Sequence, residues 1–445
     1  MDLSSWKGLK KQRTLIVLGA GASRGASFVH DVSRYEARPP LDCDFFSELQ
    51  RLGRTPETKE NVDELLRFVR MEFGLSSALS MEQFFSQVES TDSFHKEIKI
   101  NPGRRNEQYQ KALEQFYCSL PILFNKSIGN KSCEYHERLV NCLHTNDIIL
   151  SFNYDCLIDT ALRNRAGKRW NPKEGYGFPV QGDVSNWCAR RSRGKNAKNS
   201  ILLLKPHGSL NWCIDKKRQV ILEEKPYDIP SAKDRIIPPT WFKNPRKKPY
   251  KSVWESIRRE IQGCSALVVI GYSMPSTDLF SRALFKTDLQ SIKFLVVANP
   301  NHSDRQKFID LIKDKIGEFA PIVEFDNLKD LASSLKPLTD GTVRWGNIPV
   351  SFPGSPFGER HPYGEAGFRF HQGIQINFYF PFTIGGYFYF ILPAGTEPAR
   401  LLNEKGRDQI HKWVKTGSCE WRLAYGQNLT GRSPRCYTLT VRPAG

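Results

Sequence analysis

Short runs of Val, Ile and Leu recur along most of the chain, and each run ends in polar or small residues. The runs are TLIVLGAG, DIILSFNYD, ILLLKPHGS, ALVVIGYS, KFLVVANP and PIVEFDN. Runs that are apolar on both faces are typical of strands in a parallel sheet that helices cover. Helical patterns lie between several of them, such as NVDELLRFVRMEF, YQKALEQFYCSLPILF, DLFSRALFK and RQKFIDLIKDKIGEF. This alternation predicts an α/β fold with a Rossmann-like, doubly wound parallel sheet over roughly residues 10–335.

The composition changes after about residue 336, where glycine, proline and aromatic residues become frequent. We expect residues 1–335 to form the larger α/β domain and residues 336–445 a smaller, mostly β module. The stretch INFYFPFTIGGYFYFIL at 376–392 is interrupted by Pro381 and by Gly385 and Gly386, and it is shorter than a membrane span requires. It predicts aromatic strands that turn at the glycine pair.

The first apolar run leads into a glycine turn, within TLIVLGAGASRGASF at 14–28. Gly19 and Gly21 match the first two glycines of the G-x-G-x-x-G pattern, which let a backbone approach a pyrophosphate closely. Arg24 occupies the third glycine position and the next residues form a poor helix, so we expect a long loop there. The pyrophosphate would be held by the backbone N–H groups of Gly19, Ala20 and Gly21, with a hydroxyl contact from Ser23 and charge from Arg24. An ordinary strand-to-loop turn is the alternative.

Polar residues follow the other apolar runs. They are Asn153 and Asp155 in SFNYD, His207 in KPHGS, Gly271 and Ser273 in GYS, and Asn299 in ANP. Because ligands bind outside the carboxyl ends of the strands in α/β sheets, we expect these residues to gather at one edge. Two simpler interpretations stay open. Asp155 could cap a helix in CLIDTALRN, and Asn299 could shape a turn before Pro300.

The charge balance narrows the kinds of partner. The 445 residues include 65 Lys and Arg against 47 Asp and Glu, a formal net charge of +18 at pH 7. This balance favours anionic partners such as nucleotides, nucleic acid or acidic protein surfaces. Two basic stretches stand out, and solvated loops are the simplest interpretation of both. They are Arg190, Arg191, Arg193, Lys195 and Lys198, and then Lys243, Arg246, Lys247, Lys248 and Lys251.

Cysteine usage and the N-terminal residues bear on the compartment. The ten cysteines include no C-x-x-C pair, which argues against a disulfide-dense secreted domain and against a four-cysteine zinc module. The first residues hold no long apolar stretch with a cleavage-like site. We therefore expect no signal peptide and a cytoplasmic protein.

The ordered set G-A-G-A-S, S-F-N-Y-D, H-G, G-Y-S and V-A-N resembles the sirtuin family, in particular the Sir2-like domains of bacterial anti-phage defence proteins. The stretches PPLDCDFF and SMEQFFSQVES are similar to that bacterial branch, and the resemblance covers about residues 10–330. Deacetylating sirtuins carry a zinc-binding insert with two cysteine pairs, whereas this chain has only Cys213 and Cys264 between His207 and Gly271. The resemblance therefore implies a domain that consumes NAD+ as substrate, with no zinc. Tyr272 stands where the deacetylases typically have threonine.

The resemblance also implies roles for the residues at the strand ends. Asn153 would orient the nicotinamide ribose or the attacking water, and Asp155 would support that geometry. His207 would act as general base on a ribose hydroxyl or on water. The adenosine side would be lined by Gly271, Ser273 and Asn299.

The leading interpretation is an NAD+ glycohydrolase that releases nicotinamide and ADP-ribose, used as a defence effector that depletes NAD+ in abortive infection. One alternative is transfer of ADP-ribose to a macromolecule, or deacylation of one. Another is a non-catalytic sensor subunit that binds NAD+ or nucleic acid. We expect a homo-oligomer or a partner protein of the same defence system, no membrane association, and a C-terminal module that serves assembly or partner binding.

Overall fold

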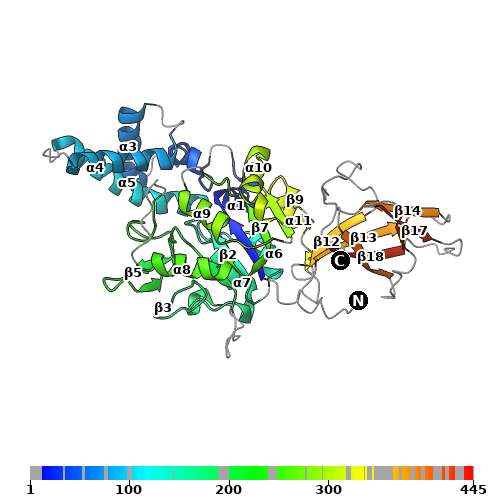
Figure 1. Cartoon of the computed structure of the whole chain (residues 1–445). Helices are drawn as coiled ribbons and strands as arrows, with labels where there is room; N and C mark the ends of the chain where they lie inside the picture. Colours follow the sequence, from blue (N-terminus) through cyan, green and yellow to red (C-terminus); the bar gives the residue numbers. More distant parts are fainter. Residues whose placement is uncertain are drawn as a thin grey trace.

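The computed structural model places a parallel sheet with its helices first along the chain, and antiparallel strands after it (Figure 1). The α/β part is described over residues 13–33, 36–52, 56–74, 79–97, 103–143, 145–188, 200–238, 248–275, 278–292, 294–316 and 322–334. Beyond these, the structure describes residues 336–337, 343–344, 364–369, 373–380, 386–391, 396–403, 413–415, 420–425 and 435–443.

The main sheet has six strands in the order β4-β2-β1-β7-β8-β9, and every neighbouring pair is parallel. The strands are β1 (Arg13–Leu18), β2 (Ile148–Ser151), β4 (Leu202–Leu204), β7 (Cys264–Ile270), β8 (Phe294–Ala298) and β9 (Ile322–Phe325). Each overlaps one of the apolar runs of the sequence, and nearly all their described side chains are buried. The prediction of a Rossmann-like, doubly wound parallel sheet is confirmed.

The strand order reverses between β1 and β7. Strands that follow β1 in the chain build the sheet outward to β4, whereas the chain then returns to β7 and builds the other half. In doubly wound folds this reversal leaves a crevice at the carboxyl ends of the two central strands, and ligands bind there. The glycine turn after β1 and the GYS segment after β7 both lie at this point.

Helices surround the sheet, and a long helical insertion separates β1 from β2 (Figure 1). The insertion contains α2 (Phe45–Gln50), α3 (Pro56–Phe73), α4 (Met81–Glu97), α5 (Gly103–Ser127) and α6 (Glu134–Asn141). Aromatic side chains from α2, α4 and α5 pack edge to face in its core, among them Phe45, Phe46, Phe84, Phe85 and Phe116. The other helices are α7 (Leu157–Arg165), α8 (Tyr250–Ile261), α9 (Leu279–Thr287), α10 (His302–Leu311) and α11 (Leu328–Ser334).

The segment after the glycine turn differs in detail from the long loop that the sequence predicts. A single helical turn, α1 (Ala20–Arg24), follows β1 directly. The described residues after it contain only the short 3-10 helices Ser27–Asp31 and Asp42–Asp44 before α2 begins. The loop is therefore present, but it starts one helical turn later than expected.

Two smaller groups of strands complete the described chain. A three-stranded sheet lies within the α/β part and has the order β3-β6-β5, with β3 (Val180–Gln181), β5 (Trp212–Ile214) and β6 (Val220–Leu222). The C-terminal strands are β10 (Lys336–Pro337), β11 (Val343–Arg344), β12 (Gly364–Arg369), β13 (Gly373–Phe380), β14 (Gly386–Ile391), β15 (Thr396–Asn403), β16 (Trp413–Lys415), β17 (Glu420–Tyr425) and β18 (Arg435–Pro443). The domain boundary near residue 336 stays a prediction.

The C-terminal strands correct one expectation. Strands β13 and β14 do flank the glycine pair, as the aromatic stretch predicts, but they do not pair with each other. Strand β13 lies between β12 and β18 in a six-stranded sheet, whereas β14 pairs with β17 in a three-stranded one. A local hairpin was expected because the glycine pair suits a tight turn, but pairing with strands far along the chain prevails.

The two basic stretches of the sequence lie largely outside the described residues. The first stretch lies within 189–199, which is not described. Most of the second lies within 239–247, and only its Lys248 and Lys251 are described. Within the described residues, none of the helices combines the length and the apolar character needed to cross a membrane.

Candidate active site

A cavity of about 600 Å³ opens at the carboxyl ends of the central strands. Its volume lies within the range of small-molecule sites in proteins. All the candidate residues line this one cavity: Gly19, Ala20, Gly21, Ser23, Arg24, Asn153, Asp155, His207, Gly271, Ser273 and Asn299. They lie in segments that follow five different strands, namely β1, β2, β4, β7 and β8, so only the fold brings them together.

The two turns at the crevice pack backbone against backbone. The Gly19 N–H donates to the Ile270 carbonyl at 3.0 Å, and the Gly21 N–H donates to the Gly271 carbonyl at 2.9 Å. Gly271 has φ +59°, and a Cβ on it would lie 2.2 Å from the Ala22 nitrogen. A Cβ on Gly19 would lie 2.5 Å from the Gly271 carbonyl oxygen. Glycine is required at these positions because no side chain fits between the turns.

These hydrogen bonds correct the assignment of the turn's donors. The N–H groups of Gly19 and Gly21 were expected to hold a pyrophosphate, but both already donate to the end of β7. Ala20 is the first residue of α1, and the N–H groups of a helix's first turn have no acceptor within the helix. The glycines therefore allow close packing of the two turns, and of the three proposed backbone donors only that of Ala20 remains for a ligand.

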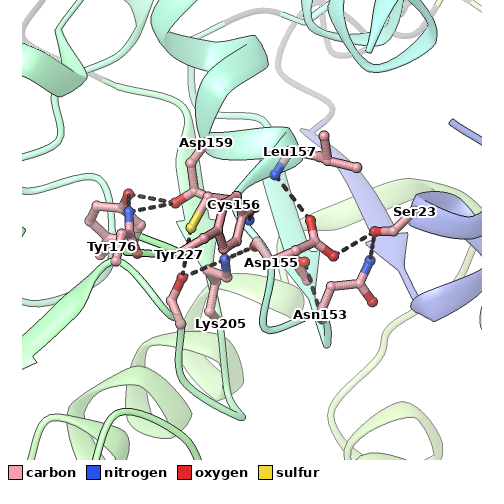
Figure 2. Close-up of polar contacts among 12 residues, drawn as sticks. Ser23, Asn153, Asp155, Cys156, Leu157, Asp159, Tyr176, Lys205 and Tyr227 are labelled. Carbon is pink, nitrogen blue, oxygen red and sulfur yellow. Dashed lines mark hydrogen bonds and ion pairs between the residues drawn. The ribbon is translucent and has the colours of Figure 1, made fainter. Parts of the chain in front are cut away.

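Asn153, Ser23 and Asp155 form one hydrogen-bonded group beside this contact (Figure 2). The Asn153 amide nitrogen donates to the Gly19 carbonyl and to the Ser23 hydroxyl oxygen, each at 2.9 Å. The Ser23 hydroxyl donates in turn to the Asp155 carboxylate at 2.6 Å. Ser23 was expected to contact the pyrophosphate, but its hydroxyl is engaged between these two side chains. It links the glycine turn to the end of β2.

The orientation of the Asn153 amide follows from these partners. A carbonyl oxygen can only accept, so the side of the amide that faces Gly19 must be the nitrogen. The amide oxygen, Oδ1, is buried and has no hydrogen-bond partner in the described structure, and Asn153 itself is only 8% exposed. A buried acceptor without a partner is costly unless a ligand or water satisfies it. Asn153 thus offers a fixed acceptor in the wall of the cavity.

Asp155 precedes Cys156, the N-cap residue of α7, and each of its carboxylate oxygens has a partner. One carboxylate oxygen accepts the Ser23 hydroxyl, and the other accepts the Leu157 N–H at 3.0 Å at the start of α7. Asn299 likewise shapes its turn, because its side-chain oxygen accepts the Asn301 N–H at 3.0 Å, and it also lines the cavity. In each case the local structural role and the place in the cavity coexist.

The fully buried side chain of Lys205 contacts the segment that follows β2. The Lys205 amine donates to the Asp155 carbonyl at 2.6 Å, to the Ser209 hydroxyl at 2.6 Å and to the Asp159 carboxylate at 3.0 Å (Figure 2). Burial acts to lower the pKa of Lys205, but the charge of Asp159, the hydrogen bond to it and the further charges nearby together outweigh burial, and the pKa is raised. The amine is therefore a charged donor. Tyr176 donates to the other Asp159 oxygen at 2.6 Å, which completes the group.

His207 lies in the segment that follows β4, and it lines the cavity. Its carbonyl accepts the Ile237 N–H at 2.8 Å, and Gly208 next to it has φ +87°. The imidazole packs edge to face on Phe152, with 5.1 Å between ring centroids. Its Nε2 atom lies 3.7 Å from the Asp278 carboxylate. The backbone and the aromatic contact fix where the ring can point.

Arg24 contacts two carboxylates and a backbone carbonyl of its own chain. Its guanidinium donates to the Pro39 carbonyl at 2.7 Å, to Glu48 at 3.0 Å and to Asp44. Two carboxylates therefore pair with its charge, and the expectation that it offers charge to a phosphate stays a prediction. Arg24 holds the loop after α1 to the start of α2. Its side chain still forms part of the cavity wall.

Sequence reasoning missed the wall that the helical insertion supplies. Met81 and Glu82 come from α4, and Leu120 and Phe124 come from α5. A signal for α4 was present, because Ser80 and Gln83 form a reciprocal capping box of the S-x-x-Q type. No sequence signal placed α4 and α5 over the crevice. Asp278 was also missed, although it precedes a predicted helix.

Within the described parts of the chain, no group of three or more His, Cys, Asp and Glu side chains is arranged to hold a metal ion. Cys213 and Cys264 are both free thiols.

Comparisons with known proteins find similarity within the α/β part. Residues 147–310 match the model of the SIR2-like domain. The comparison with curated proteins gave no match. Among solved structures, one that describes the mechanism and regulation of Sir2 enzymes is 12% identical, with a TM-score of 0.27, and the match covers 70% of this chain and 96% of that one. A Sir2 homologue variant in complex with ADP-ribose is 13% identical, with the same coverages and a TM-score of 0.27. The match over residues 147–310 identifies a SIR2-like domain in this chain, which implies an NAD-dependent enzyme.

Proposed function

We propose that this chain hydrolyses NAD+ to nicotinamide and ADP-ribose. The SIR2-like domain supports NAD+ as the ligand, and the cavity at the crevice supports a site for it. The single observation that carries the proposal is the Asn153 amide oxygen. It is buried, fixed in orientation and without a partner in the described structure, and Asn153 lines the same cavity as His207.

The proposed reaction uses each of these groups once. The bond between the ribose C1′ atom and the nicotinamide nitrogen breaks, and its electron pair neutralises the pyridinium. The oxygen of a water molecule bonds to C1′, and its proton passes to His207. The Asn153 oxygen accepts a hydrogen bond from that water or from a ribose hydroxyl, which orients it for attack. Asp155 holds Ser23, and Ser23 holds the Asn153 amide.

The charge of the cavity wall also fits a substrate with a cationic leaving group. Carboxylates from several segments line the cavity: Asp42, Glu82, Asp155, Asp278 and Asp304. Negative charge near a pyridinium favours its binding. The apolar side chains from α4 and α5 provide a surface against which a flat aromatic ring can pack.

The test is to incubate the purified protein with NAD+ and to separate the products by chromatography. Asn153→Ala and His207→Ala should each remove nearly all turnover, because one loses the fixed acceptor and the other the base. Asn125→Ala and His302→Ala are matched controls, since both residues are exposed and neither lines the cavity. Circular dichroism must show that all four variants fold.

Each outcome separates this proposal from its alternatives. Nicotinamide and ADP-ribose from the wild type and the two controls, but not from the cavity variants, would support hydrolysis. NAD+ binding without turnover would instead favour a sensor subunit. Release of nicotinamide only when a protein or nucleic acid is present would favour ADP-ribosyl transfer. Depletion of cellular NAD+ on expression, absent in His207→Ala, would support the role of a defence effector.

A further inference from the structure

Asp278 has a different task at each of its carboxylate oxygens. Oδ1 accepts the Ser281 N–H at 3.3 Å, which caps the start of α9. Oδ2 accepts the Tyr272 hydroxyl at 3.2 Å and lies 3.7 Å from Nε2 of His207. Asp278 is only 3% exposed and lines the cavity. The helix cap therefore fixes the direction in which the second oxygen faces the imidazole.

One aromatic ring, Phe152, packs against both His207 and Tyr272. Tyr272 stacks on Phe152 with 4.4 Å between ring centroids and 6° between the ring planes. The other neighbour of Phe152 is the His207 imidazole, which packs on it edge to face. Burial, and then the Asp278 charge, raise the pKa of Tyr272 well above its usual value, so the phenol stays protonated and donates. Phe152 thus connects Tyr272 and His207, the two side chains that face Oδ2 of Asp278.

We propose that Asp278 is a positioning residue for His207: its Oδ2 atom orients the imidazole and balances the positive charge that the ring acquires when it takes a proton. This inference rests on the proposed function. The proton that the attacking water loses stays on His207, and Asp278 remains a carboxylate throughout. The separation of 3.7 Å is longer than a hydrogen bond, and such catalytic contacts often tighten only when substrate is bound.

The test uses Asp278→Asn, which removes the charge but keeps the shape and the capping oxygen. Asparagine is as good an N-cap as aspartate, so α9 should remain intact and the melting temperature should change little. We expect kcat for NAD+ to fall by about 10²-fold, with KM nearly unchanged, because the lost interaction acts on the protonated imidazole. Tyr272→Phe keeps the stacked ring and removes one donor to Asp278, so a smaller fall in kcat is expected.

Asp288→Asn is the matched control, on the same helix. Asp288 follows the last turn of α9, pairs with Arg258 at 3.1 Å and does not line the cavity. It should leave kcat unchanged. Wild-type kcat in Asp278→Asn, with an active wild type, would overturn the inference and leave the proposed function intact. If Asp278→Asn melts much earlier, Tyr272→Phe decides, and an unchanged kcat there overturns the inference. No turnover by the wild type itself would overturn the proposed function, and the inference with it.

Discussion

Replacing Gly271 by alanine should separate the two turns at the crevice. The new Cβ would lie 2.2 Å from the Ala22 nitrogen and 2.3 Å from the Gly21 carbonyl carbon. Both atoms belong to the backbone, so no side-chain rotation relieves the contact. Gly167 offers a matched control, because its φ is +57° against +59° at Gly271 and a Cβ on it meets nothing within 4 Å.

The difference between the two variants gives the energy of the contact. A side chain at this left-handed φ costs about 1–2 kcal/mol at either position. At Gly271 the overpacking of backbone adds about 1–3 kcal/mol or more. We therefore expect Gly271→Ala to lower the free energy of unfolding by about 2–5 kcal/mol, and Gly167→Ala by about 1–2 kcal/mol.

Urea unfolding followed by circular dichroism measures both free energies, and product chromatography measures NAD+ turnover. Because the Gly271 carbonyl accepts the Gly21 N–H, displacement of the turn should also move the Asn153 partners and reduce turnover in Gly271→Ala alone. Equal destabilisation in the two variants, with turnover retained in both, would refute the reasoning. It would mean that the turns can move apart without affecting the site.

Lys205→Met should lower the free energy of unfolding by about 3–5 kcal/mol, because it leaves the buried Asp159 carboxylate without its cation. Adding Asp159→Asn should recover part of this loss in the same urea assay. Arg24→Ala should lower the melting temperature but leave the affinity for NAD+ unchanged, because the charge of Arg24 pairs with Glu48. A higher Kd for NAD+ in this variant, measured by calorimetry, would contradict this prediction. NADP+ should have a lower kcat/KM than NAD+, because carboxylates outnumber cations in the described cavity wall and a 2′-phosphate is repelled. Asp304→Asn should bring kcat/KM for NADP+ closer to that for NAD+. Equal kcat/KM values for the two nucleotides in the wild type would contradict the prediction.

The sheet could be predicted from the sequence because its signal is local. Each central strand is an apolar run that is buried on both faces, and helical patterns lie between the runs. The edge at which the polar residues meet follows from the parallel arrangement alone. The pairing of β13 and β14 with distant strands could not be predicted, because the glycine pair predicts only a local turn.

The candidate site was predicted as a set of residues but not as a set of bonds. A sequence can place Ser23 and Arg24 beside a cavity, yet it cannot show which acceptors their donors choose. Arg24 meets Asp44 and Glu48 only because the loop after α1 returns to α2. Asp278 could be predicted as a helix cap, whereas the approach of its second oxygen to His207 depends on how the fold places the start of α9 beside the segment that follows β4.

These bonds change the meaning of the glycine turn. In the dinucleotide-binding pattern the glycines let the backbone approach a pyrophosphate. Here the Gly19 N–H faces β7, and its carbonyl accepts the amide of Asn153. Close packing against Gly271 fixes that carbonyl, and the carbonyl in turn fixes which side of the amide faces the cavity. A turn that could shift would leave the amide free to rotate, and the acceptor would no longer be aimed. The glycines therefore act on the ribose side of the proposed reaction, through Asn153, as much as on the phosphates.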